Sequence, residues 1–445
     1  MRRWVSVVIS AAMCVAIAIT SALPVAHAED DESFPSEYLT PAMWVSRSSL
    51  STKQIASAVR AAGAVEAISY VISFPFLPLT AHTRDGVDKL RLANGWRIPF
   101  ATMVTPPEFI AAVGGEAMAA PLLRGEVLIG ETSAKVRSAH VGDVITLRDR
   151  HFGVHTFVIG AIVPDLFVDE GDIAMSRESA AVFGLVPKDL VMFTGMSSAS
   201  ALVSALRNRG IQTDSKFRVH TSWALPNPDA SIGTGIAKSI FGEFAYRPTA
   251  GSSIQVSADW ANKNIVWKKV FRDIPIANNC HKITVAAIQG ALTEIKKAGL
   301  ARAIDVANSN RYGGCFVGRF NRLAGVYGSP SRHAWGMAFD INTNANPQGG
   351  IPKMNCAVVR IFRKWGFAWG GNFPWADGMH FEYVGTRRDQ RGYPSIYCPN
   401  KVSVPTTTLP VFGATTTSST TTTISSTTTS TTTAPTTTVA ITSIT

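Results

Sequence analysis

Two stretches of the sequence each place a histidine close to an aspartate. Residues 331–340 read SRHAWGMAFD and residues 377–382 read DGMHFE. Imidazole nitrogens and carboxylate oxygens are suitable ligands for a catalytic zinc ion, which takes about three protein ligands and keeps one position open for water. His333, Asp340 and His380 are therefore the candidate metal ligands. Asp377 comes three residues before His380 and can reach the water without being a ligand itself.

His333 and Asp340 can meet at one ion only if the chain bends between them. On a straight strand, a separation of seven residues would place them on opposite faces and more than ~20 Å apart. Gly336 permits such a bend. Residues 338–341 are then predicted as a strand with Asp340 on its polar face.

Residues 380–384 are also predicted as a strand, with Asp377 in the turn before it. Side chains alternate along a strand, so His380 and Glu382 point to one side while Phe381 enters the core. Glu382 is predicted to orient a ligand from behind and not to bind the metal.

Together the two stretches resemble the zinc D-alanyl-D-alanine peptidase family, which includes carboxypeptidases, dipeptidases and L-alanyl-D-glutamate endolysins. Its signature is S-x-H-x-x-G-x-A-x-D, joined later by (E/D)-x-x-H. The first part is filled by Ser331, His333, Gly336, Ala338 and Asp340, and the second by Asp377 and His380. The resemblance extends from a helix predicted at 282–300 to Tyr383.

The resemblance implies the role of each residue. His333, Asp340 and His380 would bind Zn²⁺, and Asp377 would act as the general base. The family also uses an upstream arginine that stabilises the oxyanion, and GGCFVGRF nominates Arg319, with Arg322 as a competing candidate. Trp369, Asn372, Phe373 and Trp375 flank the site in sequence and are candidates for a substrate groove or, for Trp369, the core.

The expected function is hydrolysis of peptidoglycan stem peptides by a metal-activated water, as a D-Ala-D-Ala carboxypeptidase or an L-Ala-D-Glu endopeptidase. An aspartate at the base position is similar to the endolysin branch, so the scissile bond stays open. The alternative is a non-catalytic, zinc-containing cell-wall binding or surface protein.

The remaining sequence indicates export. Arg2 and Arg3 precede an apolar run that ends in Ala26-His27-Ala28, so residues 1–28 are typical of a secretory signal peptide, with an uncleaved anchor as the alternative. The formal net charge of +11 suits an anionic surface such as a cell wall. No basic run with interleaved aromatics is present, so no nucleic-acid partner is expected.

Four cysteines remain after the signal peptide, and an even number in an exported chain predicts two disulfides. Three pairings are possible. We favour Cys280 with Cys315 and Cys356 with Cys398, because each closes a local loop. No CxxC spacing suggests a structural zinc site.

We expect an α+β chain of two domains. Residues 29–225 are expected to form an α+β extracytoplasmic domain of unknown role, with an unidentified partner. Residues 226–239 are rich in Pro, Gly, Asn and Ser and are expected to form a linker. Residues 240–400 are expected to form the zinc peptidase domain, a small antiparallel sheet with helices packed on it. Residues 401–445 are a Thr/Ser-rich tail expected to be disordered. Helices are predicted at 282–300, ending at Gly299, and at 358–365, with a strand at 367–369.

The most informative part of the front domain is 125–163, where we predict a strand at 127–129, a helix at 132–138, and strands at 144–147 and 156–163. This run resembles the extracytoplasmic core domain of macrolide-efflux-type transporter permeases. His151 and His155 lie in the predicted hairpin and are expected to be ordinary surface residues.

Overall fold

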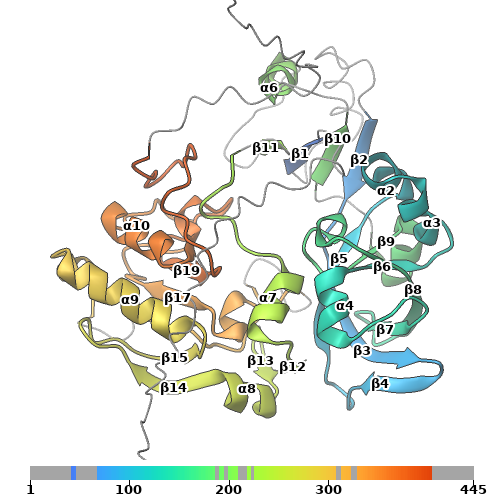
Figure 1. Ribbon diagram of the computed structural model, residues 1–445, viewed down its shortest axis with the longest axis horizontal. Coiled ribbons are helices and arrows are strands. Elements are labelled where there is room, and N and C mark those ends of the chain that lie inside the picture. The colour runs from blue at the N-terminus through green and yellow to red at the C-terminus, as the bar shows by residue number, and fades with distance from the viewer. Residues whose placement is uncertain are drawn as a thin grey trace, which may run out of the picture. The chain divides into compact units, whose positions relative to one another are not determined.

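The computed structural model describes residues 42–46, 68–185, 190–194, 199–208, 218–221, 225–306, 312–321 and 328–402. The predicted signal peptide, Arg322 and nearly all of the Thr/Ser-rich tail lie outside these ranges. Helices and sheets are mixed, as the α+β prediction requires (Figure 1). Within the described ranges, no helix is both long enough and apolar enough to cross a bilayer.

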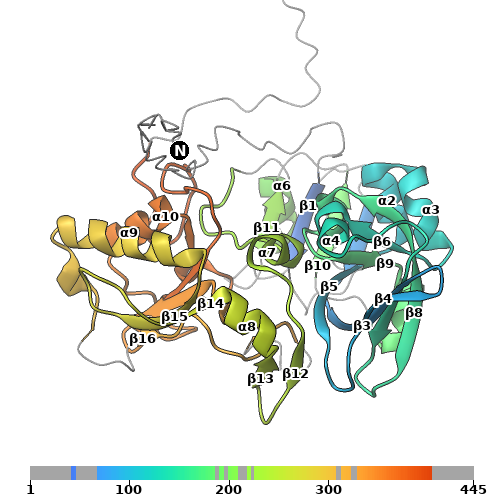
Figure 2. The same cartoon turned by 60° about the horizontal axis from the view of Figure 1, so that its bottom comes forward.

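The front part of the chain is built on a sheet that closes on itself (Figures 1 and 2). Its β7 pairs with β8 on one side and with β3 on the other, so six of its seven strands form a closed barrel. Inward-facing side chains such as Phe100, Ile129 and Ile145 are fully buried. In sheet order the strands are β4 (Val87–Arg91), β3 (Phe76–Arg84), β5 (Ile98–Val104), β9 (Ile173–Met175), β6 (Val127–Gly130), β8 (Val154–Val163) and β7 (Val144–Arg148).

The predicted elements of 125–163 are confirmed as β6, helix α4 (Glu131–Arg137), β7 and β8. β7 and β8 are antiparallel neighbours, and the turn between them carries an exposed His151. His155 is half-buried, with its Nε2 3.0 Å from Asp149 Oδ2. His151 is therefore at the surface as predicted, whereas His155 is half-buried beside Asp149 and Phe183. The closure of the barrel was not predicted.

Further elements complete the front part. Helices α2 (Pro107–Gly114) and α3 (Glu116–Leu123) pack on β6 and β9 through residues such as Ile110 and Leu122. A separate four-stranded sheet has the order β11 (Arg218–Thr221), β1 (Ala42–Ser46), β10 (Leu190–Thr194) and β2 (Ile68–Ile72). Helix α6 spans Ala199–Asn208.

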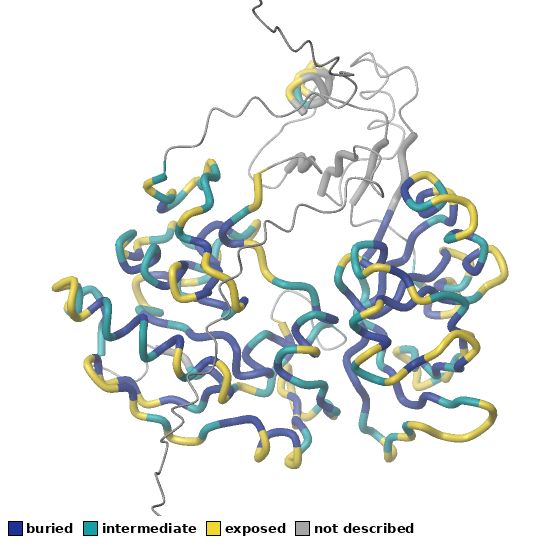
Figure 3. Tube along the Cα trace, viewed as in Figure 1, coloured by how far each residue is buried: buried dark blue, intermediate teal, exposed yellow. Residues whose placement is uncertain are grey.

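A four-stranded antiparallel sheet forms the C-terminal part. Its order is β16 (Tyr312–Gly313), β17 (Ala338–Ile341), β19 (His380–Tyr383) and β18 (Phe367–Trp369). Helices α9 (Thr284–Lys297) and α10 (Cys356–Lys364) share one apolar core with these strands, through side chains such as Leu292, Phe362 and Phe381. The buried residues follow these strands and the barrel strands (Figure 3).

The predicted helices and strands of this part are confirmed within a few residues. Gly299 adopts a positive φ of 73° after α9, and Leu300 N–H donates to Ile295 O, which ends the helix as expected. Two hairpins, β12 (Tyr246–Pro248) with β13 (Ile254–Val256) and β14 (Ile265–Val270) with β15 (Ala277–His281), precede α9. Helices α7 (Thr234–Phe241) and α8 (Ala258–Asn264) lie beside them in sequence.

Both favoured disulfides are present, Cys280–Cys315 and Cys356–Cys398. Each joins elements of the C-terminal part. The locality of the four cysteines in sequence was therefore a sound guide to their pairing.

The segment predicted as a linker, 226–239, contributes buried charges to both parts. Lys238 of α7 is fully buried, and its Nζ lies 2.8 and 3.0 Å from the two carboxylate oxygens of Asp172 in the front part. Asp229 is buried at 1% exposure and pairs with Arg363 of α10. The composition of the segment resembles that of linkers, but its charged residues are integrated into the fold.

Candidate active site

Three side chains from separate elements converge at one end of the C-terminal sheet. The 3₁₀ turn η5 (Arg332–Trp335) carries His333, β17 carries Asp340 and β19 carries His380. Asp340 and His380 are directly opposed in the antiparallel register. One ligand atom of each of the three residues lies within 4.8 Å of the others.

The bend predicted at Gly336 brings His333 back toward the strand. Gly336 adopts a left-handed φ of 66°, and its N–H donates to His333 O at 2.9 Å. Ser331 precedes the turn and its hydroxyl accepts from His333 N–H at 3.4 Å. A side chain at position 336 would place Cβ 2.9 Å from the backbone nitrogen of His281, so both the conformation and the space favour glycine.

Hydrogen bonds fix which ring nitrogen of each histidine faces the site. His333 Nδ1 is 2.8 Å from Gly314 O, so it carries the proton and leaves the Nε2 lone pair free. His380 Nε2 is 3.1 Å from Glu382 Oε1, so Nδ1 is the nitrogen that faces the site. His333 Nε2 and His380 Nδ1 are 3.2 Å apart, and each lies 2.9–3.3 Å from an oxygen of Asp340.

This donor set fits a zinc ion. Two imidazole nitrogens and one carboxylate are common ligands of catalytic zinc sites. Each histidine donates its other N–H to a carbonyl or carboxylate, the usual arrangement that orients metal-binding imidazoles. The prediction that Glu382 lies behind His380, with Phe381 buried in the core, agrees with these contacts.

The electrostatics also favour a cation. Burial raises the pKa of Asp340, but the neighbouring His333 and His380 outweigh it and hold that pKa far below its usual range. Burial likewise raises the pKa of Glu382, yet its bond to His380 brings it down to about 2. Burial lowers the pKa of His380, but Asp340 and Glu382 raise it to about 10. Two ionised carboxylates thus demand positive charge at the histidines.

Asp377 lies at the edge of this cluster, in the loop that connects the 3₁₀ turn η6 (Gly370–Asn372) to β19. Its Oδ2 accepts a hydrogen bond from Gln348 Nε2 at 3.1 Å, and its buried Oδ1 has no hydrogen-bond partner among the described residues. Burial, together with the charge of Asp340, raises its pKa, while His380, His333 and Arg319 oppose the rise. A buried carboxylate oxygen next to these three candidate metal ligands is available to exchange a proton.

Arg319 is half-buried and its charge acts on Asp377. Its carbonyl accepts from Ser331 N–H at 2.9 Å, so its backbone lies beside the start of the His333 turn. Its Nη1 donates to Phe320 O at 3.3 Å. The competing candidate, Arg322, lies outside the described residues.

The four predicted groove residues divide into two pairs. Trp369 is fully buried in the core, and Asn372 is buried and bonded to Asp229. Phe373 is half-buried with its ring beside the His380 ring, and Trp375 is 49% exposed. Phe373 and Trp375 are therefore the pair that can contact a ligand.

Sequence reasoning did not identify Gln348 or Asp229 as neighbours of the site. Gln348 is 29 residues from Asp377 and Asp229 is 143 residues from Asn372 along the chain. Neither belongs to a spaced motif. Asp229 carried one weak signal, a single acid within a stretch otherwise free of charge.

Residues 325–383 match a protein-family model described as D-alanyl-D-alanine carboxypeptidase. The match includes the three candidate ligands, Asp377 and Glu382, and it supports peptidase activity related to peptidoglycan. It does not reach Arg319 or the front part, whose likeness to permease domains stays a prediction. No curated protein matches the chain.

Proposed function

We propose that the protein is an extracytoplasmic zinc peptidase that hydrolyses peptide bonds in peptidoglycan stem peptides. One observation carries the proposal: His333, Asp340 and His380 converge next to an unpaired carboxylate oxygen of Asp377, inside the matched peptidase segment. A purely structural histidine pair would not need this unpaired acid beside it.

The ion would be held by His333 Nε2, His380 Nδ1 and the Asp340 carboxylate, the atoms that face one another. When bound, zinc lowers the pKa of water and polarises a carbonyl group. Gly314 O and Glu382 keep the two imidazoles in the required orientation through their second nitrogens.

Asp377 would move the proton. Its Oδ1 takes a proton from the attacking water and returns it to the leaving amine, while Gln348 holds Oδ2 in place. The raised pKa of Asp377 brings it closer to neutral pH, where a general base is most effective. Arg319 would stabilise the negative charge that develops on the carbonyl oxygen.

Export and wall binding support the choice of substrate. Two disulfides are typical of an oxidising compartment. Loss of Arg2 and Arg3 with a cleaved signal peptide would leave the chain strongly basic, which suits the anionic cell wall. The site would act on D-Ala-D-Ala or L-Ala-D-Glu bonds. We also propose that residues 29–225 and 240–400 are separate domains.

The test uses the full mature chain on two soluble stem peptides, one ending in D-Ala-D-Ala and one containing L-Ala-D-Glu, with products identified by mass spectrometry. Hydrolysis of at least one peptide should stop with a chelator and return with Zn²⁺. Asp377→Asn should abolish most of it, while Asp259→Asn, an acid exposed on α8, should not. A folded, zinc-loaded chain that cuts neither peptide would overturn the proposal.

A further inference from the structure

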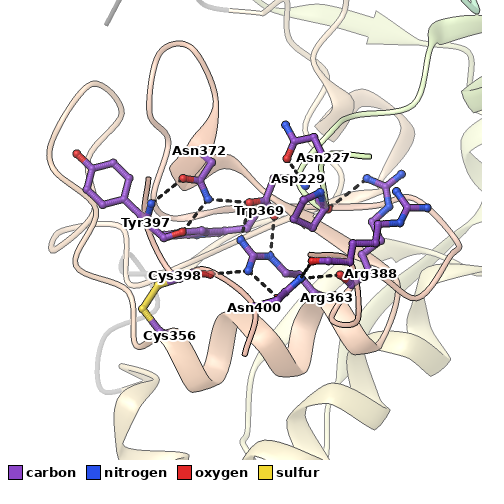
Figure 4. A network of polar contacts seen from close by, with 12 residues as sticks. Asn227, Asp229, Cys356, Arg363, Trp369, Asn372, Arg388, Tyr397, Cys398 and Asn400 are labelled. Atoms are coloured by element: carbon purple, nitrogen blue, oxygen red, sulfur yellow. Dashed lines mark hydrogen bonds and ion pairs between the residues drawn. A yellow bond between two sulfur atoms is a disulfide. The ribbon is translucent and has the colours of Figure 1, made fainter. Parts of the chain in front are cut away.

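A further buried carboxylate, Asp229, binds the first residues of the loop that carries Asp377. It accepts four hydrogen bonds (Figure 4). Arg363 Nε and Nη2 donate to its two oxygens at 2.9 and 2.5 Å. Trp369 N–H donates to Oδ1 at 3.1 Å and Asn372 Nδ2 donates to Oδ2 at 2.7 Å.

Two of these four hydrogen bonds, those from Arg363, neutralise the charge of Asp229. The bidentate pair with Arg363 compensates the buried charge of Asp229. The other two bonds go to the end of β18 and to η6, which together begin the 370–379 loop. Asp229 thus connects a segment far upstream of the matched residues to the first residues of this loop.

The loop in turn holds Asp377 through short backbone contacts. Asp377 N–H donates to Gly370 O at 2.8 Å, and Phe373 N–H donates to the same oxygen at 3.0 Å. Trp369 Nε1 donates to Gly378 O at 2.9 Å, which fastens the far end of the loop to the core. Gly370 lies between Trp369 and Asn372, the two residues that donate to Asp229.

We infer that Asp229 is a positioning residue, which sets the place of Asp377 Oδ1 by anchoring the 370–379 loop through Trp369 and Asn372. The inference rests on the proposed function. A displacement of about 1 Å in a reacting group can cost about 10²-fold in rate. Other contacts hold the later part of the loop: Gln348 Nε2 donates to Asp377 Oδ2 at 3.1 Å and Gly349 N–H donates to Ala376 O at 2.6 Å, so Asp229 anchors its first residues.

Asn372→Ala removes one anchor of the loop and leaves the Asp229–Arg363 pair intact. It also removes the two hydrogen bonds between Asn372 and the Tyr397 backbone, each 2.9 Å, which Asp229→Asn keeps. Asn400→Ala is the matched control. Asn400 Oδ1 accepts from Arg363 Nη1 at 3.0 Å, so it belongs to the same network but on the side away from the loop. Asp229→Asn is a third variant that keeps the shape and removes the charge.

Four quantities are measured on the full mature chain: kcat, KM, bound zinc, and hydrogen exchange of peptides covering 370–379. Asn372→Ala should lower kcat by about 10²-fold with little change in KM or zinc, and should speed exchange across the loop by about tenfold. Asn400→Ala should leave kcat and loop exchange near wild type. Asp229→Asn, if it folds, should follow Asn372→Ala.

Equal effects of Asn372→Ala and Asn400→Ala on kcat and loop exchange would overturn the inference, as would an unchanged kcat in Asn372→Ala. The exchange measurement needs no activity and separates the two proposals. An inactive wild type with a loop still loosened by Asn372→Ala would refute the proposed function and keep the anchor. An active wild type whose loop exchange is unchanged by Asn372→Ala would keep the proposed function and refute the anchor.

Discussion

Acidification should reduce the contribution that one buried histidine, His281, makes to the free energy of unfolding. Asp169, whose pKa burial raises to about 7, acts in the opposite direction, so the effect is read as a difference between variants. The side chain of His281 is 1% exposed, Nε2 lies 3.1 Å from Phe241 O, and Nδ1 accepts from Ile283 N–H at 3.3 Å. A neutral ring with its proton on Nε2 satisfies both contacts. A charged ring would direct a second N–H at the N–H of Ile283. Burial lowers the pKa of His281 to about 4, against a smaller opposing effect of the Phe241 carbonyl.

The size and sign of the effect follow from this pKa. In the unfolded chain His281 takes up a proton near pH 6.5, whereas in the folded chain it does so only near pH 4. Between these values His281 binds more protons in the unfolded state, so its contribution to the free energy of unfolding falls as the pH falls, by about 1.4 kcal/mol per pH unit. The loss totals about 3 kcal/mol and levels off below about pH 4.

His380 does not contribute to this slope in metal-free protein. Burial lowers its pKa, but its bonds to Asp340 and Glu382 raise it to about 10, so it is protonated in both states below pH 6.5. Its own stabilising contribution is lost only as the pH rises from 6.5 toward 10.

The assay is denaturant unfolding of metal-free, disulfide-intact protein at several pH values between 6.5 and 4. Wild type is compared with His281→Gln, whose amide can still donate to Phe241 O, and with His151→Gln, at an exposed position. The free energy of unfolding of wild type should fall about 3 kcal/mol further than that of His281→Gln across this range. Parallel curves for the two proteins would refute the reasoning, as would a similar change of slope in His151→Gln.

Three further predictions concern single residues. Glu382→Gln should weaken zinc binding about 10–100-fold in a competition titration, because it orients His380; unchanged affinity would remove that role. Arg319→Lys should lower kcat about 10²-fold or more with zinc content retained, because an ammonium cannot reproduce the guanidinium geometry; wild-type turnover would contradict it. Lys238→Met should cost about 3–5 kcal/mol in denaturant unfolding, because it leaves the buried charge of Asp172 undercompensated; a loss below about 1 kcal/mol would show that the neighbouring arginine suffices.

The parts of the fold that depend on near neighbours in sequence could be predicted. The apolar spacing of 282–300 and a glycine stop specify α9, and alternation specifies β17 and β19. The convergence of His333, Asp340 and His380 could be predicted because their types and order are demanding, and Gly336 marks the bend between the first two. The disulfides could be predicted because the four cysteines are locally grouped.

The parts that depend on distant pairs could not be predicted. Closure of the barrel rests on pairing of β7 with β3, which no local pattern encodes. Asp229 and Arg363 are 134 residues apart, and each alone looks like an ordinary surface charge in the sequence. The composition of 226–239 indicates only that the segment is polar and favours turns. The burial of Asp229 and Lys238 depends on their partners Arg363 and Asp172, which are distant in the sequence.

Zinc stoichiometry in three proteins tests whether His333, Asp340 and His380 together bind one zinc ion. Metal content is measured by mass spectrometry on wild type, His380→Ala and Asp377→Asn after equilibration with Zn²⁺ and removal of the excess. We expect one zinc per wild-type chain, none in His380→Ala, and one in Asp377→Asn, because Asp377→Asn keeps all three proposed ligands. Stoichiometric zinc in His380→Ala, or none in wild type, would contradict this expectation.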